Sequence, residues 1–211
     1  MNLFDDIIGA VSGAVSESWA SRSRRNEGSE RLIAPPPAGT PLLVSLAVAL
    51  EHTGIYIGEN KVVELQDDGF VKAVSLTDFI NGDTAPWPLR NGTRIFAACD
   101  ACSRNPISRS AIASVARRMA DDSYYVGYDF IRHNCHFFTA SCAVGLEPNN
   151  EALVRLFAKG AVSIGRLERF LARRLNDQRR IEWCPVARHK ERFHYKLTTE
   201  KLVRLRMEGK R

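Results

Sequence analysis

Residues 128–145 read Y-D-F-I-R-H-N-C-H-F-F-T-A-S-C-A-V-G, and they place Cys135 directly before an apolar run that ends at Gly145. This run predicts a helix that starts near the cysteine and stops at the glycine. The first turn of a helix has backbone N–H groups without partners and carries the positive end of the helix dipole. Both effects favour a thiolate over a thiol, and the thiolate is the reactive form of cysteine. The stretch therefore predicts a reactive cysteine at a helix N-terminus.

A packing role is the alternative for Cys135, because free cysteines often fill space in protein cores. Its neighbours are R-H-N before it and H after it, whereas a core cysteine has mostly apolar neighbours. Cys142 lies two helical turns further along the same predicted face and has small, mostly apolar neighbours. The same helix thus offers one candidate nucleophile and one candidate packing residue.

A second motif, E-H-T-G-I-Y-I-G at residues 51–58, reads as a strand that carries a candidate base, His52. The alternative is a polar residue on an edge strand. Gly54 lacks a side chain on the same strand face, which predicts open space for a substrate beside the imidazole. A cysteine on a helix start that faces a histidine on a strand is the arrangement of papain-like thiol enzymes.

A general base needs a partner that orients its second ring nitrogen. Glu64, in the V-V-E-L strand at residues 62–65, is the candidate, and Gln66 is its substitute if the register slides by two. A plain two-residue turn at residues 59–60 would put His52 and Glu64 on opposite faces. A three-residue loop or a β-bulge would put both on one face.

Together, H-T-G-I-Y-I-G at 52–58, V-V-E-L at 62–65 and N-C-H-F-F at 134–138 resemble the lecithin:retinol acyltransferase family over roughly residues 34–146. That family belongs to the circularly permuted papain-like thiol hydrolases, in which histidine precedes cysteine. The resemblance implies an α+β fold in which an antiparallel sheet packs against the helix that bears the nucleophile, with further helices flanking it.

The resemblance also implies roles for three residues: Cys135 as nucleophile, His52 as base and Glu64 at the third position, where the family often has histidine. The chain departs from the family pattern at two places, neither of which changes the nucleophile or the base. The family usually has N-C-E-H-F where this chain has N-C-H-F-F, and it usually has Gly-Asp where this chain has G-T-P at residues 39–41.

The chemistry implied is that of a cysteine hydrolase or acyltransferase that works through an acyl-thioester, with backbone N–H groups at the helix start stabilising the oxyanion. Lipid esters at a membrane surface are the substrates that the resemblance favours. Two alternatives stay open. One is a papain-like peptidase or amidase acting on protein or peptidoglycan, including a toxin-like effector. The other is a non-catalytic module that binds a membrane or a partner.

Charge is divided unevenly along the 211 residues, whose net charge is +6. Residues 1–150 hold 13 Lys and Arg against 17 Asp and Glu, whereas residues 151–211 hold 17 against 7. We expect three parts: an N-terminal amphipathic helix (3–19) with a linker over 1–33, a catalytic domain over 34–147, and a basic helical C-terminal extension over 148–211. The extension is expected to contain helices at 151–158, 164–175 and 199–206.

The basic extension predicts contact with an anionic surface such as lipid headgroups. Aromatic residues interleave with its basic ones, a pattern that also suits single-stranded nucleic acid. The chain has neither a phosphate loop nor a helix-turn-helix signature, so a nucleic acid partner is not expected.

No apolar run reaches the roughly 18 residues that a membrane-spanning helix needs. No basic stretch precedes the first apolar residues, so no signal peptide is expected. The five cysteines have no secreted-scaffold spacing and suit a reducing compartment. We expect a cytoplasmic or peripheral membrane location, with export as an effector left open.

A zinc site is the competing interpretation of the C-x-x-C pair Cys99 and Cys102, with His133, Cys135 and His136 as further ligands. Structural zinc sites usually have two well-separated ligand pairs. Here the second group is crowded at one helix start. Packing cysteines are therefore the expectation, and we expect neither a metal nor another cofactor.

Overall fold

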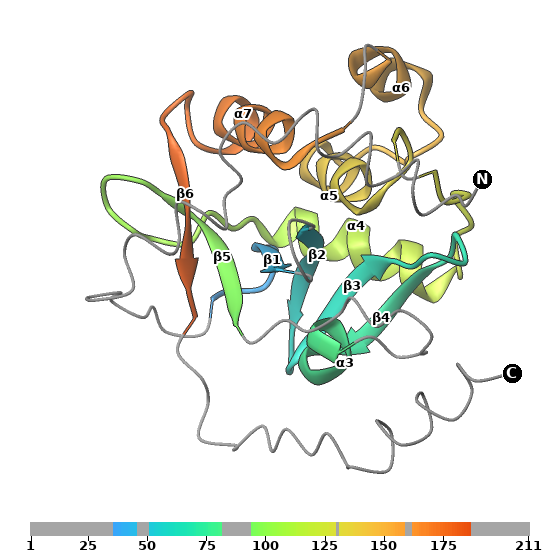
Figure 1. Cartoon of the computed structure of the whole chain (residues 1–211), viewed down its shortest axis with the longest axis horizontal. Coiled ribbons are helices and arrows are strands. Elements are labelled where there is room, and N and C mark those ends of the chain that lie inside the picture. Colours follow the sequence, from blue (N-terminus) through green and yellow to red (C-terminus); the bar gives the residue numbers. More distant parts are fainter. Residues whose placement is uncertain (1–35, 46–50, 82–93, 130, 159–161, 187–211) are drawn as a thin grey trace, which may run out of the picture.

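A computed structural model describes residues 36–45, 51–81, 94–129, 131–158 and 162–186. These residues form an α+β fold with a six-stranded antiparallel sheet and five helices (Figure 1). In chain order the elements are β1 (Pro41–Ser45), β2 (Glu51–Gly58), β3 (Lys61–Leu65), β4 (Val71–Ser75), α3 (Leu76–Asn81), β5 (Ile95–Asp100), α4 (Ser110–Asp121), α5 (Cys135–Val144), α6 (Glu151–Phe157), α7 (Ile164–Leu175) and β6 (Ile181–Pro185).

The strand order is β4-β3-β2-β1-β5-β6, so the first four strands form a meander and β5 adds to its β1 edge. Alternation along the strands divides the buried apolar residues between the two faces of the sheet. On one face, Ile55 and Val63 join the larger core beneath α4, α5 and α7. On the other face, Tyr56 and Val62 pack with Phe79 of α3 in a smaller core. Each face of the sheet therefore has its own helical cover (Figure 1).

The β2–β3 hairpin contains the irregularity on which the predicted site depends. Ile55 pairs with Val63, but Gly58 pairs with Lys61, so the register shifts by one through a bulge. The turn residues Glu59 and Asn60 both have positive φ, as a tight hairpin turn requires. Since the bulge changes the alternation by one residue, even-numbered residues of β2 and β3 share a face.

The described part of the C-terminal region packs into the same sheet and core as the residues before the predicted boundary at 147. The helices predicted at 151–158 and 164–175 are present as α6 and α7, but their apolar residues belong to the larger core. Residues 181–185, predicted as part of a helical extension, form strand β6 and complete the sheet beside β5. Trp183 is buried rather than displayed for a ligand, and its Nε1 donates to Glu168 Oε1 at 2.9 Å. The helices predicted at 3–19 and 199–206 lie outside the described residues.

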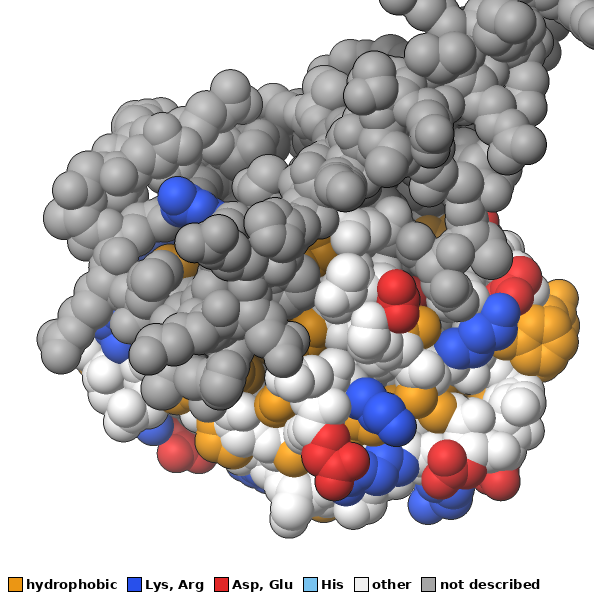
Figure 2. All heavy atoms as spheres, turned by 90° about the horizontal axis from the view of Figure 1, so that it is seen from below, with side chains coloured by type: hydrophobic (Ala, Val, Ile, Leu, Met, Phe, Trp, Pro, Cys, Tyr) orange, Lys and Arg blue, Asp and Glu red, His pale blue; other side chains and the backbone are white. Residues whose placement is uncertain are grey.

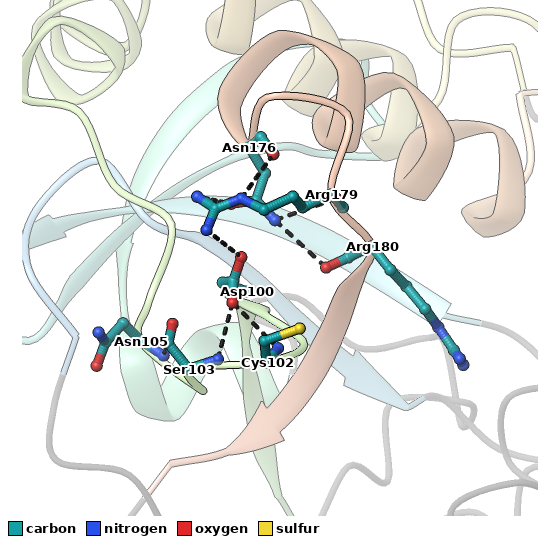
Figure 3. A network of polar contacts seen from close by, with 7 residues as sticks. All are labelled: Asp100, Cys102, Ser103, Asn105, Asn176, Arg179 and Arg180. Atoms are coloured by element: carbon teal, nitrogen blue, oxygen red, sulfur yellow. Dashed lines mark hydrogen bonds and ion pairs between the residues drawn. The ribbon is translucent and has the colours of Figure 1, made fainter.

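A polar network ties the end of β5 to the segment between α7 and β6 (Figure 3). Asp100 Oδ1 accepts the backbone N–H groups of Cys102 and Ser103 at 3.0 and 2.8 Å, and Oδ2 pairs with Arg179 at 3.4 Å. Asn176 donates to the Arg179 carbonyl at 3.1 Å. The hydrogen bond from the Ser103 backbone N–H is the largest cause that lowers the pKa of the buried Asp100 carboxyl, to about 2. The charged carboxylate therefore contributes to stability.

We predict that Asp100→Asn lowers the melting temperature at pH 7, because the folded state loses the favoured carboxylate. A folded-state pKa near 2 lies below the ordinary value of about 3.9, so this contribution is present above about pH 4 and is lost as the pH falls towards 2. Melting curves from pH 7 to pH 3 should show the difference from wild type shrinking. Asp121→Asn, at an exposed position in α4, is the matched control. A difference that stays constant with pH would contradict the prediction.

The described part of the lower side of the molecule carries acidic and basic side chains interspersed with apolar ones (Figure 2). No single sign of charge dominates the described part of that side. Among the residues that the structure describes, no helix combines the length and hydrophobicity needed to cross a membrane.

Candidate active site

Helix α5 begins at Cys135 because Asn134 caps it. The Asn134 side-chain oxygen accepts the backbone N–H groups of His136 and Phe137, both at 3.1 Å, and its amide donates to the Val162 carbonyl at 3.0 Å. The cap therefore engages two of the first-turn N–H groups that the sequence left without partners. An oxyanion site built from those two groups is not compatible with this cap, and the amide of Cys135 itself remains the candidate donor.

The thiol of Cys135 lies at the beginning of β2 and is buried. Its Sγ is 3.9 Å from the carbonyl oxygen of Glu51 and 3.9 Å from Nδ1 of His136. The imidazole of His52 is close enough for its charge to act on the thiol. Burial alone raises the pKa of the Cys135 thiol, but the imidazoles of His136 and His52 outweigh burial and hold that pKa well below its ordinary range.

The imidazole of His52 is held on its other side by Glu64. The His52 Nε2 atom is 2.6 Å from Glu64 Oε2, and both side chains are buried. Gln66 does not replace Glu64; its amide donates to the second oxygen, Oε1, at 3.3 Å. Since Nε2 is engaged by Glu64, Nδ1 is the nitrogen left for the thiol. The structure thus brings together Cys135, His52 and Glu64, the three residues selected from the sequence.

Burial alone lowers the pKa of His52, but the negative charges of Cys135 and Glu64 outweigh it and raise the pKa to about 9. Both shifts therefore favour an imidazolium beside a thiolate. A folded-state pKa above the ordinary 6.5 means that the ion pair stabilises the fold below about pH 6.5 and that this stabilisation is lost as the pH rises through 9.

The space predicted beside Gly54 is not open to a substrate. A β-carbon there would lie 2.7 Å from Val62 Cγ1 and 3.1 Å from Phe79 Cε2, so these side chains already fill it. The Phe79 ring also packs against His52, with the ring centroids 5.4 Å apart. The glycine therefore lets an aromatic ring cover the imidazole on the α3 side. A substrate must approach from elsewhere.

Two threonines of the site, Thr53 and Thr139, were missed as functional candidates, and His136 was considered only as a zinc ligand. His136 follows Cys135, and its Nδ1 is 3.1 Å from the Thr53 hydroxyl of β2. Thr139, one helical turn on, donates to the same hydroxyl at 3.0 Å. The spacing of His136 and Thr139, i and i+3, places both on one helix face and is the signal that could have indicated the pair. Thr53 has the opposite parity to His52 and so faces α5.

Cys142 behaves as the packing residue that the sequence predicted. It is fully buried in the larger core, and burial raises the pKa of its thiol far above the ordinary value. The pKa values of the Cys142 and Cys135 thiols shift in opposite directions because imidazoles lie beside Cys135 and not beside Cys142.

The C-x-x-C pair divides: Cys99 is buried in the smaller core, whereas Cys102 is exposed and so is not a packing residue. Within the described ranges, no three His, Cys, Asp or Glu side chains gather as they would to hold a metal ion. The zinc set with His133, Cys135 and His136 is accordingly not assembled there.

No family model matches the chain, and neither the curated proteins nor the solved structures include a significant match.

Proposed function

We propose that this protein is a cysteine-dependent acyl hydrolase or acyltransferase with a circularly permuted papain-like fold similar to that of the lecithin:retinol acyltransferase family. One observation carries the proposal: a buried thiol with a depressed pKa beside a histidine whose second nitrogen is held by a buried carboxylate. A cysteine is activated for attack on a carbonyl when its thiol contacts a base and that base contacts a group that orients it.

In the proposed reaction the thiolate of Cys135 attacks the carbonyl carbon of an ester, and the C=O electrons move to oxygen. The backbone amide of Cys135 donates to this oxyanion. Collapse of the tetrahedral intermediate expels the alcohol, which takes the proton of the His52 imidazolium and leaves an acyl-thioester. Neutral His52 then removes a proton from water or from an acceptor amine or alcohol, which attacks the thioester and regenerates the thiolate. Glu64 keeps Nε2 protonated throughout, so that Nδ1 faces the thiol.

Lipid esters are the proposed substrate class, following the resemblance to the acyltransferase family. The basic surplus of residues 151–211 is proposed to hold the enzyme at an anionic membrane surface. In the described part of that region, α7 carries Arg173 and Arg174 in its last turn.

Intact-protein mass spectrometry tests the proposal. Wild-type protein is incubated with phosphatidylcholine vesicles or with acylated peptide amides, quenched in acid, and weighed. We expect a fatty-acyl adduct after exposure to the lipid, with none on Cys135→Ala. Cys142→Ala, which removes a buried thiol of the same helix, should keep the adduct.

An adduct from the peptide amide alone would assign the site to a peptidase or amidase. If wild type acquires no adduct from either donor and its thiol titrates like free cysteine, the enzymatic proposal is wrong, and a non-catalytic binding module becomes the better interpretation.

A further inference from the structure

The thiol of Cys135 lies near two imidazoles, and one of them, His52, is hydrogen-bonded to the carboxylate of Glu64. His52 and Glu64 are in hydrogen-bonding contact at 2.6 Å, so the imidazolium and the carboxylate largely cancel. A thiolate buried beside this neutral pair would still be one negative charge in excess. Buried charge that lacks a compensating partner is strongly destabilising. The charge balance of the site therefore calls for a second cation.

His136 is placed to supply it. Its Nδ1 lies 3.9 Å from Sγ of Cys135, and its side chain is buried. The geometry is not that of a packing residue, because Thr53 and Thr139 form a hydrogen-bonded pair that ends on this nitrogen, at 3.0 and 3.1 Å. The two hydroxyls come from β2 and α5, so they fix the ring between the strand and the helix.

The hydroxyl chain also suits both protonation states of the ring. Since Thr139 donates to the Thr53 oxygen, Thr53 can give its own hydrogen to Nδ1 of neutral His136. When His136 is protonated, Nδ1 carries a hydrogen of its own and can direct it to the thiolate. The ring then acts as an N⁺–H donor to sulfur, the charge-assisted kind of hydrogen bond.

We propose that His136 is a second catalytic histidine, which stabilises the Cys135 thiolate by positive charge, and that Thr53 and Thr139 position its ring. The inference rests on the proposed function of Cys135 as nucleophile and deepens it. The two histidines would have different roles: His52 exchanges the proton with the reacting groups, and His136 keeps the sulfur ionised between turnovers. The charges of both imidazoles lower the pKa of the Cys135 thiol, so each contributes to keeping the sulfur ionised.

The charged groups around His136 include Glu51 of β2 as well as the thiolate. Burial raises the pKa of the Glu51 carboxyl, the charge of His136 lowers it, and the charges of Cys135 and Glu168 raise it. Glu168 lies on α7 and accepts a hydrogen bond from Trp183. His136 thus lies near acidic groups on two elements, the Glu51 carboxyl of β2 and the Cys135 thiol of α5.

The test is the rate of Cys135 alkylation by iodoacetamide against pH, read by mass spectrometry at the Cys135 peptide of the full-length protein. In His136→Asn, the amide occupies the position of the Nδ1 edge of the ring but carries no charge. We expect the midpoint to rise by about one pH unit relative to wild type, which corresponds to about tenfold slower alkylation at pH values below both midpoints. His133→Asn is the matched control, since His133 packs on Phe137 and its substitution should leave the midpoint unchanged.

A second pair of variants covers the case in which His136→Asn does not fold. Thr53→Val keeps the side-chain shape and removes the hydroxyl, and it should raise the midpoint; Thr53→Ser should restore it. A midpoint in His136→Asn equal to a depressed wild-type midpoint would overturn the role of His136 and leave the nucleophile in place. A wild-type midpoint near 8.5, the value of an ordinary thiol, would instead count against the proposed function itself.

Discussion

Replacing Glu64 by glutamine is expected to reduce kcat of the proposed acyl transfer about a hundredfold or more. The carboxylate accepts a hydrogen from His52 Nε2 at 2.6 Å, which leaves Nδ1 free to take the thiol proton. A glutamine amide can instead donate to Nε2 and so place the imidazole proton on Nδ1, where it blocks proton transfer from the thiol. Positioned proton transfer contributes about 10²- to 10⁴-fold to rates of this kind.

The pH profile of the same variant gives a second measurement. In wild type the pKa of His52 is raised to about 9, and this sets the high-pH limb, above which the imidazolium is lost. Glu64→Gln removes one of the two negative charges that raise it, so the limb should move to lower pH. Gln66→Leu is the control: the Gln66 amide donates to the other oxygen of Glu64, the one that does not contact His52, and its loss should leave kcat within a fewfold of wild type. Equal losses in both variants would mean that Glu64 does not set the tautomer.

From the sequence, His52 and Glu64 could be predicted to share a face of the sheet only if the hairpin between them contains a bulge or a three-residue loop. The sequence offers a glycine followed by Glu59 and Asn60, which is compatible with a plain turn or with a bulge, and the two outcomes reverse the face of every residue in one strand. The structure adopts the bulge, which lies between Tyr56 and Gly58. Local sequence thus restricted the site to two geometries, and strand pairing selected one.

Features that depend on tertiary packing could not be predicted in the same way. Strand β6 is a five-residue run within a basic region, and it is a strand because β5 offers it an edge. A glycine at position 54 leaves space on the strand face, and either a substrate or a neighbouring side chain could fill it. The sequence alone could not show that Phe79 fills this space. The role of Asn134 as a cap was equally open, since asparagine before a helix can cap it or face a ligand.

We expect the addition of a single methyl group to destabilise the fold most at Gly39, in the segment before β1. Gly39 has a φ of 90°, and its N–H donates to the Tyr56 carbonyl of β2 at 2.7 Å. A β-carbon there would lie far inside van der Waals contact of the Arg109 carbonyl, directly before α4. Both neighbours, the Tyr56 carbonyl and the Arg109 carbonyl, are backbone groups. Neither can move away as a flexible side chain could.

We therefore expect Gly39→Ala to lower the free energy of unfolding by about 2–5 kcal/mol, the sum of overpacking and a left-handed backbone. Two other glycines separate the contributions by denaturant unfolding. Gly145→Ala has a positive φ with open space around it, and should cost about 1–2 kcal/mol. Gly165→Ala, in α7 without a close contact, should stabilise by about 0.5–1 kcal/mol. If Gly39→Ala costs no more than Gly145→Ala, the segment does not pack against the start of α4, and the β2 strand that carries His52 lacks this support.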